Sequence, residues 1–340
     1  MLKEMGLELP VLPTTVIGSY PRPRWLVYTV KLYRAGRIGV EELREAFDDA
    51  VQAVVREQEE AGIDIPSDGE MRRDDMVEYF AERIRGFRFY GPVRVWGNNF
   101  FNKPAVVSKL VYEKPIVVEE FQFLRRVSSR SILKVTVTGP YTIADWSYNE
   151  YYPSKEDLVF ELAKIINAEI KKLEEVGALF VQVDEPALTT NPNEMEWAID
   201  AVNEVTKGVN IKLGIHICYG NYELLAKYFD RFMFSQFALE FANRGFRDIG
   251  ILDRLGDKEV GLGIVDVHSR RVETPEEVAK ALEKAFRYVR PEQVYVNPDC
   301  GLKLLPRKIA RAKLENMVRG VEIVRKELRE RGLDRIPLRR

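Results

Sequence analysis

Two cysteines and two histidines are the only residues of these types in the 340-residue chain, and three of the four could together hold a metal ion. His216 precedes Cys218 by two positions, and Cys300 follows the turn-forming residues 297–299. One imidazole nitrogen and two thiolates suit zinc, with a fourth position left for a carboxylate or an exogenous group. Glu240, between them in the sequence, is the nearest candidate. The spacing matches no zinc-finger pattern, so two buried, inert cysteines remain the alternative.

The second histidine, His268, lies in the segment VDVHSRR. Histidine titrates near neutral pH, and Asp266 is close enough in the sequence to tune it, so His268 is a candidate proton donor or acceptor. A histidine that packs in the core or caps a helix is the alternative. Trp146 follows Gly-Pro-Tyr-Thr, and we expect it at the start of a loop near the active site, either as core packing or as a stacking platform.

Acidic residues follow two of the predicted strands. Asp184 and Glu185 come directly after an apolar segment, and Asp68 and Glu70 follow an earlier one. The sequence offers no evident cation for Glu70. Because acids next to buried strands are either paired or functional, several of them in one cavity indicate a substrate ammonium group as the missing positive partner.

Short β-branched segments alternate with amphipathic helical patterns along the whole chain. The predicted strands span residues 14–18, 63–67, 132–138, 179–184, 211–217, 235–240, 260–265 and 293–297. The predicted helices span residues 41–61, 74–85, 119–129, 155–176, 194–207, 222–230, 246–255, 275–289 and 307–331. This alternation predicts an α/β fold, a (β/α)8 TIM barrel made by residues 1–340 as a single domain, with a doubly wound sheet as the alternative. Aromatic residues and glycine turns at 86–118 predict a β-hairpin insertion.

In a (β/α)8 barrel the carboxyl ends of all strands share one face, and active sites lie on that face. The unusual polar residues of this chain directly follow predicted strands. They are Ser19, Asp68, Glu70, Asp184, Glu185, His216, Cys218, Glu240, Asp266, His268, Asp299 and Cys300. Chance placement explains such a shared position poorly, so we expect these side chains around one cavity.

The charge balance argues against two classes of partner. Lys+Arg 52 against Asp+Glu 53 gives a net charge of -1, which provides no electrostatic reason to expect nucleic acid or an anionic membrane. No apolar run approaches the roughly 20 residues that span a bilayer. The first residues, MLKEMGLELPVLPTT, lack the basic start and apolar middle of a signal peptide. We therefore expect a cytoplasmic protein.

At these motifs the sequence resembles the catalytic domain of cobalamin-independent methionine synthase. The matching segments are PTTVIGSYPRP, SDGEMRRDDMVEYF, VTGPYTIADWSY, VQVDEPAL, IHICYGNY, VDVHSRRVETPEEV and VNPDCGLKLLPRKIARAKLENM. They follow the order of the family and run from residue 13 to about residue 317. The family fold is a (β/α)8 barrel, which agrees with the alternation of strands and helices.

The resemblance implies a role for each matching residue. It implies one zinc ion per chain, held by His216, Cys218, Glu240 and Cys300. It implies that His268 is the acid that protonates the leaving amine of a folate donor, and that Trp146 lines the site of this donor. It also implies a homocysteine site made by Ile17, Gly18 and Ser19, with Glu70 and Asp184 at the amino group.

Three departures from the family pattern concern the pteridine side. The longer members have an additional N-terminal half of similar fold, which this sequence lacks. An Arg-Cys pair before a Lys-Pro is replaced in residues 98–104, which read NNFFNKP, and a family glutamate appears as Thr190. The chain thus resembles the short core form found in archaea and some bacteria. For this form the methyl donor is a methyl-tetrahydropterin or folate, or a methylated corrinoid protein, and a separately encoded N-terminal-half protein is a candidate partner.

The sequence therefore predicts a methyltransferase that forms methionine by transferring a methyl group to the zinc-bound thiolate of L-homocysteine. One alternative is a zinc-dependent methyltransferase for another thiol, such as coenzyme M. The implied roles of Ser19, Glu70 and Asp184 argue against it, because these residues recognise an amino acid. The other alternative is a non-catalytic zinc-binding barrel.

Overall fold

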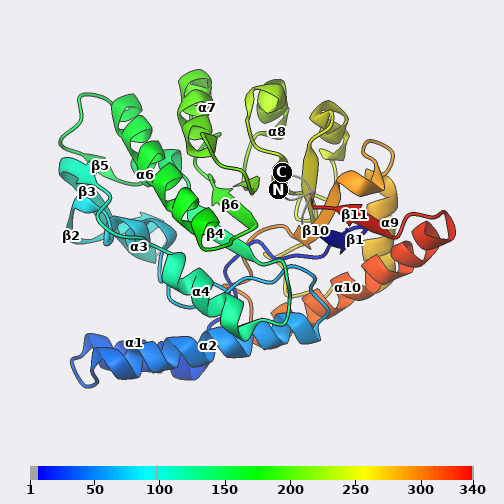
Figure 1. The fold of residues 1–340 in the computed structure, drawn as a ribbon, viewed down its shortest axis with the longest axis horizontal. Helices are drawn as coiled ribbons and strands as arrows, with labels where there is room; N and C mark the ends of the chain where they lie inside the picture. Colours follow the sequence, from blue (N-terminus) through cyan, green and yellow to red (C-terminus); the bar gives the residue numbers. More distant parts are fainter. Residues whose placement is uncertain (1–6, 97–98, 339–340) are drawn as a thin grey trace.

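Six parallel strands form the central sheet of the computed structural model, which describes residues 7–96 and 99–338 (Figure 1). They are β4 (Lys134–Thr138), β6 (Phe180–Asp184), β7 (Lys212–Ile217), β8 (Gln236–Glu240), β9 (Glu259–Val265) and β10 (Val294–Pro298). The order across the sheet is β10-β9-β8-β7-β6-β4. Every residue of these strands is buried, as expected for a parallel sheet that is covered on both faces. All six confirm strands predicted from the sequence, within two residues at each end.

The two remaining predicted strands, 14–18 and 63–67, appear as isolated bridges. Residues 14–15 bridge in parallel to β10 on one side and to Ile65 on the other. A backbone hydrogen bond of 3.0 Å from Lys134 to Pro66 continues the chain of contacts to β4. Pro66, within the second segment, has no N–H to donate, which shortens the pairing there. The short segments thus lie between the two edge strands of the central sheet.

Helices follow the strands in sequence and lie outside the sheet (Figure 1). They are α1 (Arg24–Arg34), α2 (Val40–Glu60), α3 (Met76–Ala81), α4 (Val118–Val127), α5 (Pro140–Asp145), α6 (Lys155–Glu175), α7 (Met195–Asn203), α8 (Tyr222–Leu225), α9 (Pro275–Ala285) and α10 (Arg307–Glu330). Two predicted helix starts are confirmed at the same residues, Lys155 for α6 and Pro275 for α9. The side chain of Ser154 accepts a hydrogen bond from the Asp157 backbone, and Thr274 and Glu277 form a capping box.

Several helical predictions need correction. The predicted helix 246–255 is a 3-10 helix over Ile249–Leu255, and Gly250 within it weakens the preference for an α-helix. The predicted helices 194–207 and 222–230 are only partly α-helical, because 3-10 turns replace their ends. The sequence analysis missed α1 and α5 altogether.

The hairpin insertion predicted at 86–118 is confirmed. Strands β2 (Arg85–Trp96) and β3 (Asn99–Val111) pair antiparallel, and β5 (Tyr148–Asn149) joins β3 in parallel. The hairpin ends at residue 111, and the predicted turn at 97–98 lies outside the described residues. At the other end of the fold, β1 (Glu8–Pro10) pairs antiparallel with β11 (Arg335–Pro337) and brings the first and last described elements together.

Two lysines of the central strands, Lys134 and Lys212, are buried in the core along with the aliphatic and aromatic side chains. Lys212 forms an ion pair with Glu259. Lys134 donates to the Val16 carbonyl at 2.8 Å and to Gln182 at 2.9 Å, and burial lowers its pKa to about 7. These partners compensate for removing the ammonium groups from water. Among the described helices, none has both the length and the apolar character needed to cross a membrane.

Candidate functional site

Three potential metal ligands meet at the carboxyl ends of the central strands. His216 lies near the end of β7, Cys218 follows that strand, and Cys300 follows β10. Their ligand atoms all lie within 4.8 Å of one another. His216 and Cys218 are buried, and Cys300 is half-buried. The structure therefore brings together three of the four side chains that the sequence analysis assigned to zinc, although they are up to 84 positions apart.

The imidazole of His216 has a defined orientation in this cluster. Its Nδ1 lies 3.0 Å from the Ala238 carbonyl oxygen, which can only accept, so Nδ1 carries the proton. Nε2 is consequently the nitrogen with a free lone pair. It is buried and has no hydrogen-bond partner within residues 7–96 and 99–338. A buried orphan nitrogen beside two thiols fits a zinc ion, because metal-bound histidines ordinarily use their other nitrogen for such a backbone bond.

The two thiols interact strongly with each other. A hydrogen bond from Cys218 lowers the pKa of Cys300 well below its ordinary value, and the same interaction together with burial raises the pKa of Cys218. Burial alone would lower the pKa of His216, but the close approach of Cys300, followed by the charges of Cys300 and Asp184, raises it. Cys300 is therefore the group of the pair that ionises first, and thiolate is the form that binds metals.

Glu240, the fourth assigned ligand, lies at the end of β8 and is also buried. Its carboxylate is not part of the three-residue cluster. One oxygen accepts from the Tyr219 backbone N–H at 2.8 Å, and the other accepts from Asn243 at 3.3 Å. Burial raises its pKa, and the negative charge of Cys300 raises it further. In this structure Glu240 is thus engaged by two hydrogen-bond donors beside the cluster.

Glu70 and Asp184, assigned to a substrate amino group, are close enough to influence each other electrostatically. Burial raises the pKa of Asp184 to about 7, and Glu70 adds to this effect. Burial likewise raises the pKa of Glu70. The expectation that Glu70 has no cation needs correction, because Arg73 lies 3.9 Å from its carboxylate, and Thr136 donates to it at 2.9 Å. The sequence could have suggested Arg73, which follows Glu70 by three positions.

Ile17, Gly18 and Ser19 lie against the same acids and the metal cluster. A Cβ added at Gly18 would overlap the Glu70 carboxylate, and one added at Gly301 would overlap the Ser19 hydroxyl. The carbonyl of Ile17 accepts from Gln182, whose amide also donates to Asp184 at 2.7 Å. Because Gly301 directly follows Cys300, Ser19 lies beside the residue next to this thiol, while Gly18 contacts Glu70 and Ile17 is linked to Asp184 through Gln182.

His268 is exposed on the loop that follows β9. Its Nε2 lies 3.1 Å from the hydroxyl of Tyr219, a residue that the sequence analysis overlooked although it directly follows Cys218. Asp266 accepts a hydrogen bond at 2.8 Å from the backbone N–H of His268, and not from its imidazole ring. The tyrosine hydroxyl, and not Asp266, is therefore the group that the structure places at the imidazole.

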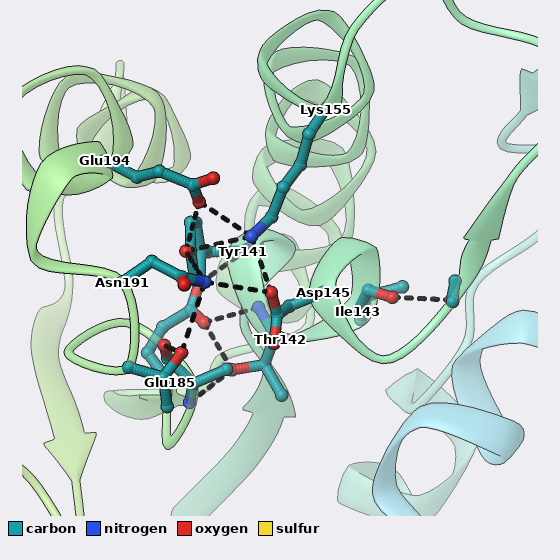
Figure 2. A network of polar contacts seen from close by, with 11 residues as sticks. Tyr141, Thr142, Ile143, Asp145, Lys155, Glu185, Asn191 and Glu194 are labelled. Atoms are coloured by element: carbon teal, nitrogen blue, oxygen red, sulfur yellow. Dashed lines mark hydrogen bonds and ion pairs between the residues drawn. The ribbon is translucent and has the colours of Figure 1, made fainter.

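Trp146 is the C-cap residue of helix α5, so it begins the turn that follows this helix, and its side chain packs half-buried against the core. Figure 2 shows how α5 is held. At its start, Glu185 accepts from the backbones of Tyr141 (2.9 Å) and Thr142 (2.8 Å) and from the Thr142 hydroxyl (2.6 Å). At its end, Lys155 bonds to Asp145. This lysine also donates to the Tyr141 hydroxyl and to Glu194 at the start of α7.

The sequence departs from the family pattern at Thr190 and at residues 98–104, and the structure describes the first of these sites fully. Thr190 is exposed, and its hydroxyl donates to the Ala187 carbonyl at 2.7 Å, so it closes a turn. Its neighbour Asn191 joins the network of Figure 2 through the Tyr141 hydroxyl at 3.2 Å. Residue 98, the first of the altered hairpin stretch, lies outside the described residues.

Comparisons with known proteins agree with this geometry. A family model described as cobalamin-independent synthase, catalytic domain, matches residues 12–322. A protein named methionine synthase from Thermococcus kodakarensis is 58% identical over 98% of this chain and 99% of its own length. A methionine synthase from Sulfurisphaera tokodaii is 57% identical, with 98% of each chain covered.

Solved structures extend the comparison. A B12-independent methionine synthase from Shewanella sp. W3-18-1, in complex with selenomethionine, has a TM-score of 0.86 and 31% identity, covering 94% of this chain and 99% of that one. A methyltransferase from Methanosarcina mazei has a TM-score of 0.61 at 13% identity, covering 95% and 96% of the two chains, which indicates a shared fold only. The chain belongs to the cobalamin-independent methionine synthase family, as a member of its catalytic-domain group.

Proposed function

We propose that this chain is a zinc-dependent homocysteine S-methyltransferase that forms methionine. The observation that carries the proposal is the buried, unpartnered Nε2 of His216 beside the thiols of Cys218 and Cys300, next to the acid pair Glu70 and Asp184. Zinc held by the histidine and the two cysteines, with Glu240 as the fourth ligand, would keep the homocysteine thiol deprotonated at neutral pH, where a free thiol is mostly protonated.

Glu70 and Asp184 bind the ammonium group of homocysteine. Burial raises the pKa of both acids, and Glu70 raises the pKa of Asp184 further, so an ammonium group between them would relieve repulsion and desolvation together. Ile17, Gly18 and Ser19 hold the rest of the amino acid beside Cys300. The selenomethionine in the Shewanella relative supports this assignment, since it is an analogue of the expected product.

The methyl donor approaches from the exposed side of the cluster. With a methyl-tetrahydropterin or folate donor, His268 protonates the leaving nitrogen, because an amine leaves poorly without a proton. Trp146, fixed at the end of α5, lines the donor site. A methylated corrinoid protein is the second candidate donor and needs no such acid. A separately encoded N-terminal-half protein is the candidate partner that would complete the pteridine side.

We also propose that the chain is a single catalytic (β/α)8 barrel domain over residues 1–340. The short bridges at residues 14–15 and 65–66 support this proposal, because they lie between the two edge strands β10 and β4. These segments would be the first two strands of the barrel. The carboxyl ends of all eight strands would then surround the candidate site.

An assay with a panel of thiols and methyl donors tests the function. The purified chain is supplied with homocysteine or coenzyme M, and with methyl-tetrahydrofolate, a methyl-tetrahydropterin or methylcobalamin. We expect methionine from homocysteine with at least one donor, zinc near one equivalent by elemental analysis, and no methylation of coenzyme M. Zinc binding without methylation of any thiol would favour a non-catalytic barrel, and turnover of coenzyme M alone would favour the other thiol methyltransferase.

The matched variant His268→Asn distinguishes the donors. If His268 supplies a proton, the variant loses turnover with a pterin or folate donor by about 100-fold or more and keeps turnover with methylcobalamin. Equal losses with both donors would contradict the acid role.

A further inference from the structure

Tyr219 has a strained backbone next to the candidate metal ligands. Its φ is 55°, in the left-handed region that a bulky residue rarely adopts. The neighbouring contacts hold this conformation, because the Tyr219 N–H donates to Glu240 at 2.8 Å and Arg244 donates to the Gly220 carbonyl at 3.0 Å. Strained residues of this kind persist where the surroundings determine them, often at functional sites.

The side chain of Tyr219 reaches across the sheet. It starts after β7, and its hydroxyl lies 3.1 Å from Nε2 of His268 on the loop after β9, while β8 lies between these two strands. The two rings are 5.4 Å apart between centroids, at an angle of 55°. One residue therefore joins the ends of three adjacent strands: its chain continues from Cys218, its N–H holds Glu240, and its hydroxyl contacts His268.

Tyr219 is 66% exposed, so it is no ordinary core residue. An exposed tyrosine in a strained conformation contributes little to core packing, and its hydroxyl contact is the feature that the strain makes available.

We propose that Tyr219 is a positioning residue that holds the His268 imidazole beside the loop that follows Cys218, in the orientation needed to deliver a proton to the methyl donor. The proposal rests on the proposed function for its catalytic meaning. The geometric part stands independently: removing the hydroxyl releases the imidazole, and keeping the backbone N–H keeps Glu240 in place.

Nitrogen NMR tests the geometric part without any turnover. Because the chain has only two histidines, a long-range 1H–15N spectrum of the full chain contains two imidazole patterns, which His268→Asn assigns. We expect Tyr219→Phe to change the Nδ1 and Nε2 shifts of His268, and to leave the pattern of His216 and the zinc content unchanged. Tyr288→Phe, at a tyrosine that is 40% exposed and belongs to neither site, is the control and should change neither pattern.

Kinetics test the catalytic part. With a pterin or folate donor, Tyr219→Phe should lower kcat by about tenfold or more with little change in the KM for homocysteine, since it disturbs a general acid and no substrate contact. It should have no further effect in a His268→Asn background, because the two residues act as one unit. Tyr219→Asn, which tolerates the left-handed backbone, should keep the zinc content and show the same loss of kcat.

Two results would overturn the proposal. One is an unchanged His268 spectrum in Tyr219→Phe. The other is a loss of zinc in that variant comparable to the loss caused by His216→Ala, which would mean that the hydroxyl supports the metal ligands and does not position His268. If the unmodified chain forms no methionine from any donor, the proposed function fails, whereas the spectrum still decides whether Tyr219 holds His268.

Discussion

Two buried polar regions lie near the carboxyl ends of the strands, and they differ in how completely their groups are paired. Around α5, Glu185 accepts three hydrogen bonds and Lys155 contacts three oxygen atoms. In the thiol cluster, Nε2 of His216 has no hydrogen-bond partner within the described residues. The pKa of Cys300 is lowered and that of Cys218 is raised. Burying a polar group without a hydrogen-bond partner costs free energy. The fully paired α5 region therefore stabilises the fold, whereas the thiol cluster is suited to bind a ligand.

The largest expected effect concerns the cluster. His216→Ala or Cys300→Ser should remove most of the zinc and lower methionine formation by about 1,000-fold or more, because metal activation is worth several kcal/mol. Elemental analysis and kcat measure the two effects. Glu185→Gln serves as the control from the other region and should retain zinc. A cluster variant that keeps one equivalent of zinc would refute the assigned ligands.

A smaller effect is expected for Glu185→Gln itself. The amide cannot accept all three hydrogen bonds that the carboxylate accepts, and one buried N–H is left without its partner. We expect the free energy of unfolding to fall by about 1.5–3 kcal/mol, measured by chemical denaturation. An unchanged midpoint would mean that the α5 network does not stabilise the fold.

The next effect is a pH dependence that Asp184 should cause. Its folded pKa of about 7 lies above the ordinary value of 3.8, so the folded chain binds more protons between pH 4 and pH 7, and the free energy of unfolding should decline as pH rises through this window. Homocysteine binding needs the ionised form and should therefore strengthen by about tenfold from pH 6 to pH 8. Calorimetry at several pH values measures this change. In Asp184→Asn the change should be much smaller, and an equal change in both proteins would assign the titration to another group.

The smallest effect is expected for Lys155→Met, at the half-buried end of the α5 network. The lysine joins α5 to the start of α7 through Asp145 and Glu194, and the loss should be about 1 kcal/mol, because solvent weakens partly exposed ion pairs. A larger fall in the free energy of unfolding than in Glu185→Gln would show that Lys155, and not Glu185, contributes more to the stability of the α5 network. Zinc content should remain unchanged in this variant.

The regular elements were largely predictable from local patterns. Alternating β-branched and amphipathic segments located all six strands of the central sheet and the starts of α6 and α9, which Ser154 and Thr274 cap in the structure. The pattern failed where the chain is short or tightly turned. Helix α5, with six residues, shows too little periodicity to be predicted, and over the seven residues 249–255 the pattern does not distinguish a 3-10 helix from an α-helix.

The sequence by itself determined which residues could hold a metal and that they follow strands, since residue type and position after an apolar segment are local properties. It also indicated that His216, Cys218 and Cys300 share one end of the fold. Only the tertiary structure decided which atoms meet. It placed Arg73 beside Glu70, turned the Glu240 carboxylate toward the Tyr219 backbone, and brought the Tyr219 hydroxyl to His268. These contacts join loops after different strands, so they depend on strand order and loop conformation, which local periodicity does not encode.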